Sequence, residues 1–105
     1  MMDKEALRQK ELFSQFYEQH LKEKYENPKK LTLAEVAKHN SEMDCWTVVE
    51  GKVYNLTNFI KLHPGGKKIM RAAGIDGTDI FNQFHVNVEI QDTIVACFFE
   101  GLLVD

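Results

Sequence analysis

Residues 59–66, FIKLHPGG, carry the most informative pattern in this chain. The histidine of this stretch, His63, follows apolar residues and precedes a proline and two glycines. A second histidine, His85, comes 22 residues later (85 − 63 = 22) and follows the largely apolar stretch IFNQF. Each histidine taken alone is open to two interpretations: a core residue with satisfied nitrogens, or a ligand. HPGG alone is also compatible with a tight turn, because proline and glycine mark turns.

The two histidines together favour a haem site. Neutral imidazoles are good iron ligands at neutral pH, and one on each face would fill both axial positions of a haem iron. The apolar flanks would take the porphyrin faces out of water. Gly65 and Gly66 lack a Cβ, so the backbone can come close to a flat ligand. We therefore predict that His63 and His85 ligate the iron of one haem b per chain.

Residues 38–66 and 72–85 contain further motifs in a fixed order. They are Asp44-Cys45-Trp46, Gly51-Lys52-Val53-Tyr54, Leu56-Thr57-Asn58-Phe59, HPGG, and Gly74-x-Asp76-x-Thr78-x-x-Phe81. Together they resemble the cytochrome b5 haem-binding domain over about residues 31–103, and most closely its reductase-fused modules. The resemblance implies that His63 and His85 are the axial ligands. It also implies that the carbonyls of Gly66 and Phe81 accept their second N–H groups.

The resemblance further implies an α+β fold, in which two helix pairs form a haem pocket over a small mixed β-sheet. The cofactor-binding residues expected at this pocket are Leu56, Phe59, Pro64, Gly65, Gly66, Ile69, Met70, Phe81, Phe84, Ile94 and Phe98. One departure concerns the residue after His85. The free cytochromes usually have a serine there that bonds a haem propionate, whereas this chain has Val86. The propionate anchor is therefore left open, with Asn87, Lys61 or Lys67 as substitutes.

The expected elements are short and do not alternate as βαβ units, which also indicates an α+β class. The predicted strands cover residues 45–49, 52–54 and 102–104, with a turn at Glu50-Gly51 between the first two. The predicted helices cover residues 32–39, 59–62, 67–73, 78–84 and 88–99. The residues expected to begin a helix are Thr32, Thr57 or Asn58, and Thr78, whereas Gly74 and Gly101 follow helices.

Residues 3–26 are rich in Lys, Glu and Gln, with apolar residues three to four positions apart, which predicts an amphipathic helix. This helix ends at Asn27-Pro28, because the residue before a proline avoids helical geometry. We therefore divide the chain into an N-terminal helical extension, residues 1–28, and a haem-binding domain, residues 29–105. Two roles stay open for the extension: packing on the domain's own surface, or docking on a partner or a second copy.

Composition limits the other functions. The chain has 105 residues, 44% of them hydrophobic and 28% charged, which allows one domain with a modest core. A net charge of −3 gives no attraction to nucleic acid. No apolar run reaches the ~18 residues of a membrane span, and the first residues lack the apolar core of a signal peptide. Cys45 and Cys97 lack CxxC spacing and are interpreted as buried thiols in a reducing compartment. We expect a soluble, cytoplasmic monomer.

The predicted function is electron transfer. With both axial positions filled, the iron has no open position for oxygen or substrate, so we expect a carrier rather than an enzyme. The chain has no Gly-rich phosphate loop or nucleotide fingerprint. A flavin-containing reductase is therefore expected as the donor and an unidentified protein as the acceptor. The alternative is a haem-binding module without a redox role: a store, chaperone or sensor.

The remaining histidines are interpreted as surface residues. His39 follows a short predicted helix and is expected to be a solvated helix terminus, where its charge would suit the helix dipole. His20 lies on the N-terminal helix and is expected to be exposed. No pair of histidines or cysteines has the spacing of zinc ligands.

Overall fold

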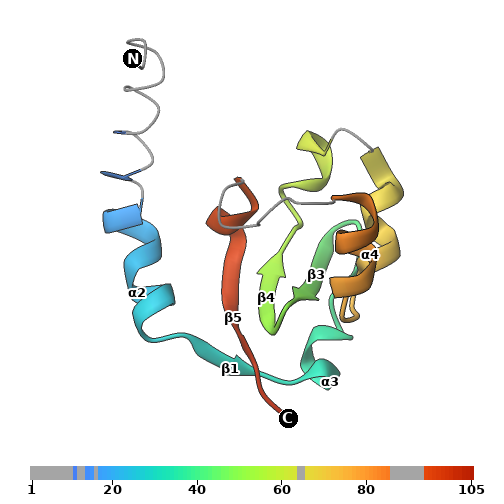
Figure 1. The fold of residues 1–105 in the computed structure, drawn as a ribbon, viewed down its shortest axis with the longest axis horizontal. Helices are drawn as coiled ribbons and strands as arrows, with labels where there is room; N and C mark the ends of the chain where they lie inside the picture. The colour runs from blue at the N-terminus through green and yellow to red at the C-terminus, as the bar shows by residue number, and fades with distance from the viewer. Residues whose placement is uncertain (1–10, 12–13, 16, 64–65, 86–93) are drawn as a thin grey trace.

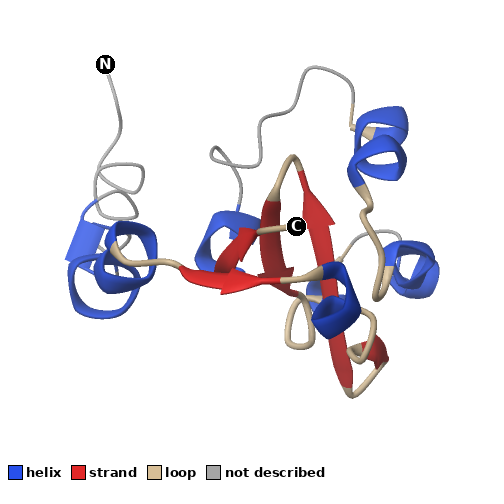
Figure 2. Cartoon of the chain, turned by 90° about the horizontal axis from the view of Figure 1, so that it is seen from below, coloured by secondary structure: helices blue, strands red, loops and turns tan. Residues whose placement is uncertain are grey.

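The computed structural model describes residues 11, 14–15, 17–63, 66–85 and 94–105. A five-stranded mixed β-sheet forms its centre (Figure 1). Helices η3 (Gly66–Ala72) and α4 (Thr78–Phe84) lie near one edge of the sheet, and α2 (Lys22–Glu26) lies near the opposite edge (Figure 1), so that Figure 2 shows helices at both ends of the molecule. The predicted α+β class with a small mixed sheet is therefore confirmed.

The strands lie in the order β1-β5-β4-β3-β2. Their bounds are β1 Lys29–Leu31, β2 Asn40–Ser41, β3 Asp44–Val49, β4 Lys52–Asn55 and β5 Phe99–Leu103. Strand β1 pairs with β5 in parallel, whereas the other neighbours are antiparallel. Strands β3 and β4 are joined by Glu50 and Gly51, whose φ angles are 51° and 78°. Two positive φ angles are typical of a type I′ hairpin turn, and the predicted hairpin is confirmed.

The C-terminal strand begins earlier than predicted. Phe99, the last residue of the predicted helix 88–99, belongs to β5, and so do Glu100 and Gly101, which were expected to precede the strand. Gly101 pairs with Lys29 of β1, and a Cβ added at Gly101 would meet the Lys29 carbonyl oxygen at 2.5 Å. Glycine is thus needed because the two backbones come so close. Strands β1 and β2 were not predicted at all.

The helical segments are less regular than predicted, although α4 covers the predicted residues 78–84 and η3 is displaced by only one residue from the predicted 67–73. They include the π-helix η1 (Tyr17–Leu21), α3 (Leu33–Val36) and the 3-10 helices η2 (Ile60–Leu62), η3 and η5 (Ile94–Phe98). Thr32 caps α3 as predicted, because its Oγ accepts a hydrogen bond from the Glu35 N–H at 3.2 Å, but the helix ends at Val36. Gly74 follows η3 with a φ of 73°, which favours glycine at the end of a helix. No helix among the described residues is long and apolar enough to cross a membrane.

The core consists of two apolar clusters on opposite faces of the sheet. The first contains Cys45, Val49, Tyr54, Leu56, Phe59 and Phe99, and the second contains Leu31, Val36, Val48 and Val53. Neighbouring residues of β3 and β4 fall into different clusters, because successive side chains of a strand point to opposite faces. The second cluster includes Val36 of α3. The first contacts residues of η2, η3, α4 and η5, so this face carries the helices that follow the hairpin.

The end of the N-terminal extension packs on the domain. Leu21 is only 2% exposed, and the ring of Tyr25 stacks on Phe99, with centroids 4.3 Å apart and planes 13° apart. The Tyr25 hydroxyl donates a hydrogen bond to the Ala96 carbonyl at 2.6 Å. Lys24 pairs with Glu100 of β5 at 3.6 Å. Of the two roles left open for the extension, its described C-terminal part therefore favours packing on the domain, whereas a domain boundary at residue 28 stays a prediction.

The Tyr25 contact predicts a measurable contribution of the extension to stability. Replacing Tyr25 by phenylalanine keeps the stacked ring and removes one hydrogen bond, so we expect a loss of about 1 kcal/mol in the free energy of unfolding. Tyr25→Ala also removes the ring from Phe99, and we expect about 2–3 kcal/mol because the ring is only partly buried. Urea unfolding of the two variants measures both values. Equal stability of Tyr25→Ala and the parent would show that the extension is not part of the folded unit.

Candidate functional site

The two segments that carry the predicted ligands begin in the same way. His63 follows η2, and His85 follows α4. An Asn-x-Thr sequence, residues 55–57, precedes the first segment, and an Asp-x-Thr sequence, residues 76–78, begins the second. In both, the Asn or Asp side-chain oxygen accepts hydrogen bonds from the threonine two residues later in the chain. The threonine hydroxyl oxygen in turn accepts a hydrogen bond from a backbone N–H of β3 or of the turn that follows β3. We call these two arrangements the threonine anchors.

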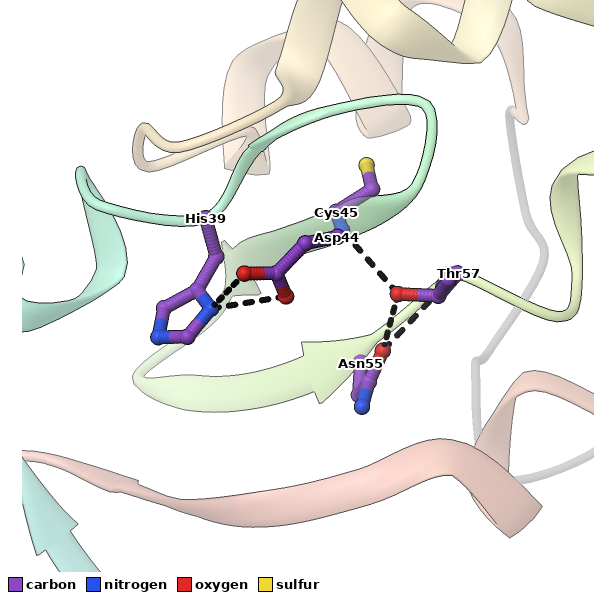
Figure 3. Close-up of polar contacts among 5 residues, drawn as sticks. All are labelled: His39, Asp44, Cys45, Asn55 and Thr57. Carbon is purple, nitrogen blue, oxygen red and sulfur yellow. Dashed lines mark hydrogen bonds and ion pairs between the residues drawn. The ribbon is translucent and has the colours of Figure 1, made fainter.

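The first threonine anchor fixes the turn between β4 and η2. The Asn55 Oδ1 accepts hydrogen bonds from the Thr57 N–H at 3.1 Å and from the Thr57 hydroxyl at 2.7 Å. The Thr57 oxygen in turn accepts the Cys45 N–H at 3.0 Å (Figure 3). A further bond runs from the Leu56 N–H to the Cys45 carbonyl at 2.7 Å. The chain leaving β4 is thus held against β3 just before it forms η2 and reaches His63.

The second threonine anchor fixes the start of α4. The Asp76 Oδ1 accepts the Thr78 N–H at 3.0 Å and the Thr78 hydroxyl at 2.6 Å. The Thr78 oxygen accepts the Glu50 N–H at 2.8 Å. Asp76 also forms a parallel bridge with Val48, so residues 75–77 extend the pairing of β3. Helix α4 and His85 at its end are therefore positioned from the same strand.

The threonine anchors correct the predicted helix caps. We expected Thr57 or Asn58 to cap a helix at 59–62 and Thr78 to cap the helix ending at Phe84. Neither η2 nor α4 has a side-chain cap bond, and Thr78 is the first residue of α4. The threonine hydroxyls instead accept hydrogen bonds from backbone N–H groups of β3 and of the turn that follows β3, because these groups lie close to them.

The imidazole of His85 has a defined orientation. Its Nδ1 lies 3.2 Å from the Phe81 carbonyl oxygen, the acceptor that the family resemblance implied. A carbonyl oxygen only accepts, so Nδ1 carries the proton and Nε2 of the neutral ring keeps its lone pair. The ring also stacks on Phe81, with centroids 4.6 Å apart and planes 14° apart. One helical turn of α4 therefore supplies both the acceptor and the ring that hold His85.

His63 lies against the first apolar cluster. Its ring meets the ring of Phe59 edge to face, with centroids 5.8 Å apart, and Phe59 is itself buried. Phe59 also lies 5.8 Å from Phe98 of η5. His63 itself is partly exposed. Its predicted acceptor, the Gly66 carbonyl, stays a prediction.

Most of the predicted pocket residues gather in this one cluster. Leu56 and Phe59 are among its buried members. Partly buried residues packed against it include four others that the sequence had singled out: Ile69, Met70, Phe81 and Phe98. They come from η3, α4 and η5 as well as from the turn after β4. The structure therefore brings together apolar side chains from both histidine-bearing segments.

Two large apolar residues next to the histidines are exposed. Leu62 immediately precedes His63 and Phe84 immediately precedes His85, and each is 61% exposed. Phe84 was predicted to line the pocket, and in this structure it does not belong to the cluster. Water-exposed apolar side chains at both ligand positions are what a flat apolar group could cover. Nothing in the sequence indicated that the Leu62 side chain would be exposed beside His63.

Several predicted residues cannot be placed. Pro64, Gly65 and Val86 lie outside the described residues, as do residues 88–93 of the predicted helix 88–99. Helix η3 begins at Gly66 and η5 begins at Ile94, but the Ile94 side chain is outside the description. The side chains of His20 and Cys97 are likewise not described.

His39 is not the solvated terminus that we expected. Its Nδ1 lies 2.7 Å from both carboxylate oxygens of Asp44 (Figure 3), and its ring stacks on Trp46, with centroids 3.7 Å apart and planes 8° apart. The reason is the short hairpin of β2 and β3, which places His39 just before a strand and opposite Trp46. His39 therefore has a structural role at the edge of the sheet, away from the two predicted ligands in sequence and in contacts.

The first cluster beneath the site stays uncharged. Burial raises the pKa of the Cys45 thiol, and the charge of Asp44 adds to this increase. Burial also raises the pKa of the Tyr54 hydroxyl, with smaller contributions from Tyr25 and Glu50. Both groups are thus protonated at neutral pH. Cys45 is a free thiol, in agreement with its interpretation as a buried apolar residue.

Comparison with known proteins identifies the family. The sequence profile described as "Cytochrome b5-like Heme/Steroid binding domain" matches residues 32–103. This chain belongs to that family. The match includes both histidines and both threonine anchors, and it begins after the N-terminal extension. The family assignment predicted from the motifs is therefore confirmed.

Related structures and sequences agree with this assignment. Cytochrome b5 of Ostreococcus tauri virus 2 is 39% identical and superposes with a TM-score of 0.65, over 71% of this chain and 96% of that one. Cytochrome b558 of Ectothiorhodospira vacuolata, a prokaryotic homologue of cytochrome b5, is 28% identical with a TM-score of 0.64, over 71% and 98% of the two chains. The predicted cytochrome b5-like fold is thus confirmed.

Larger relatives contain the same domain. Cytochrome b5 reductase 4 of Danio rerio is 46% identical over 68 residues, which are 64% of this chain and 13% of that protein. Delta(5) fatty acid desaturase A of Dictyostelium discoideum is 50% identical over 58 residues, 54% of this chain and 12% of that protein. The similarity therefore spans only a small part of these relatives.

The threonine anchors make the cytochrome b5 domain sensitive to two hydroxyl groups. Thr57→Val keeps the side-chain shape but leaves the Cys45 N–H without its acceptor, so we expect a loss of about 1–3 kcal/mol in the free energy of unfolding. Thr78→Val should cost less, because its partner Glu50 is exposed. Thr57→Ser and Thr78→Ser keep the hydroxyl and serve as matched controls. Denaturant unfolding checks the series, and equal losses in the serine and valine variants would contradict the role given to the hydroxyls.

Proposed function

We propose that this cytochrome b5 domain binds one haem b through His63 and His85 and carries single electrons. The observation that supports this most is the contact between the His85 Nδ1 and the Phe81 carbonyl. It leaves the Nε2 lone pair of a neutral imidazole available. Metal-bound histidines usually have this arrangement, with the second nitrogen donating to a carbonyl or carboxylate.

The residues around the two histidines fit a haem. Two imidazoles from separate segments match the donor set of a six-coordinate iron in a porphyrin. The uncharged first cluster provides apolar packing, since Leu56 and Phe59 are buried and Met70 and Phe81 are partly buried. Leu62 and Phe84, exposed beside the ligands, would lose contact with water on binding, which is favourable for apolar surface.

The contribution of this chain to electron transfer is to fix the positions of the imidazole rings of His63 and His85. When bound, haem supplies a metal centre that gains and loses one electron. The threonine anchors connect both histidine-bearing segments to β3, and the Phe81 carbonyl fixes the rotation of the His85 ring. Ligands that are positioned in advance need little rearrangement when the charge of the site changes. The domain thus acts as a carrier, and we assign it no substrate conversion of its own.

We infer that the electron donor is a flavin-containing reductase, because a reductase is among the relatives and this chain has no nucleotide fingerprint. The acceptor is a further protein, whose identity does not follow from these residues. The free, buried Cys45 thiol supports a reducing compartment such as the cytoplasm.

Replacing either ligand tests the proposal. We expect holoprotein of the parent chain to have a six-coordinate, low-spin absorption spectrum with sharp bands on reduction. His63→Ala and His85→Ala each remove one axial ligand, so the spectrum should become high-spin or the haem should be lost. The matched control is His39→Ala, because His39 is bound to Asp44 and Trp46 and should leave the spectrum unchanged. Low-spin spectra in both ligand variants would refute the assignment.

Carbon monoxide distinguishes the carrier from the alternative of a haem sensor. With His63 and His85 in both axial positions, carbon monoxide must first displace a histidine. We therefore expect the reduced parent protein to bind it slowly or not at all at neutral pH, whereas His63→Ala and His85→Ala should bind it promptly. Carbon monoxide binding is measured from the change in the absorption spectrum. Rapid, stoichiometric binding of carbon monoxide by the parent protein would favour a sensor.

A further inference from the structure

Charge is distributed unevenly along this chain. Residues 60–72, which form η2, His63 and η3, contain four basic residues and no acidic residue. They are Lys61, Lys67, Lys68 and Arg71, which we call the basic surface. The whole chain has 13 basic and 16 acidic residues, so the remainder has 9 basic and 16 acidic residues and a net charge of −7 (9 − 16). The positive charge therefore lies on the segment that carries one proposed ligand.

The basic surface is available to a partner. All four of its residues are exposed. Lys67 pairs with Glu42 at 3.1 Å, but both side chains are open to water, at 77% and 51%, so this pair contributes little to stability and can be exchanged. In the described part of the chain, Lys61, Lys68 and Arg71 form no ion pair.

We propose that the basic surface docks an acidic patch on a protein that exchanges electrons with this domain. This proposal rests on the proposed function, because docking at the basic surface assists electron transfer only if the neighbouring His63 is a haem ligand. Complementary charges steer two proteins into a productive orientation and increase their association rate.

A protein patch fits better than an extended anionic surface. A membrane or a nucleic acid would also present its charge to the rest of the chain, whose net charge of −7 it would repel. This repulsion is strongest at low ionic strength, because electrostatic forces reach about 30 Å at 0.01 M salt, a large part of the 44 Å that this molecule measures along its longest axis. A compact acidic patch can therefore interact with the basic surface alone.

A double charge reversal tests this docking. The double variant Lys68→Glu with Arg71→Glu changes the charge of the basic surface by four units. It keeps the ion pair between Lys67 and Glu42. The matched control, Lys22→Glu with Lys30→Glu, makes the same change on α2 and β1, on the other side of the molecule (Figure 1). The holoproteins are mixed in a stopped-flow instrument with two probes: a reduced acidic plant-type ferredoxin as donor, and basic cytochrome c as acceptor.

We expect the reversal at Lys68 and Arg71 to slow the reaction with ferredoxin about tenfold at about 0.01 M ionic strength and to speed the reaction with cytochrome c. Both effects should fade at high salt, and the control pair should change the rates much less. Equal effects in the control pair would show that only net charge matters and would overturn the proposal. So would binding of the parent to phosphatidylserine vesicles that the Lys68 and Arg71 changes abolish, because the surface would then belong to a membrane.

The absorption spectrum separates this proposal from the one on which it rests. It is recorded for each holoprotein before mixing. Without low-spin haem in the parent, the proposed electron carrier itself is wrong. With normal low-spin haem in all variants and rates that do not respond to the reversal, only the docking surface is wrong.

Discussion

The bonds that the two threonine hydroxyls make to β3 and its turn are the constraint on which the site depends. Thr57 binds the Cys45 N–H at the start of β3, and Thr78 binds the Glu50 N–H just after its end. The segment leading to His63 and the segment leading to His85 therefore both take their position from one strand. That strand is held by β4 on one side and by β2 and the Asp76 bridge on the other.

Local sequence predicted the parts of the fold that local interactions produce. The β3–β4 hairpin follows from β-branched residues around Glu50-Gly51, and the Thr32 cap of α3 follows from a capping box. Strand β1 and the first residues of β5 could not be predicted in the same way, because the two strands pair across about 70 residues of chain. The apolar residues up to Phe99 suit a helix locally, and only pairing with Tyr54 of β4 makes Phe99 the start of a strand.

The sequence predicted which residues are the candidate ligands better than it predicted how they are positioned. Spacing and apolar flanks singled out His63 and His85, and the structure gives His85 a carbonyl acceptor four residues back along α4. An Asx-x-Thr pattern could have revealed the anchors, since Asn and Asp side chains often bond the backbone two residues on. From the sequence alone, however, we interpret those threonines as helix caps. The exposure of Phe84 had no signal in the sequence, because only the path of the neighbouring segments determines it.

Aromatic contacts connect the N-terminal extension to the candidate site through the core. Tyr25 stacks on Phe99, which directly follows Phe98 in the chain. Phe98 contacts Phe59 from the side of η5, and Phe59 contacts the ring of His63. Because protein interiors are densely packed, a change in the size or position of one of these rings alters the packing of the neighbouring rings. The extension lies outside the match to the family, yet its last turn contributes to the cluster beneath His63. A continuous series of aromatic contacts therefore links the described end of the extension to the candidate site.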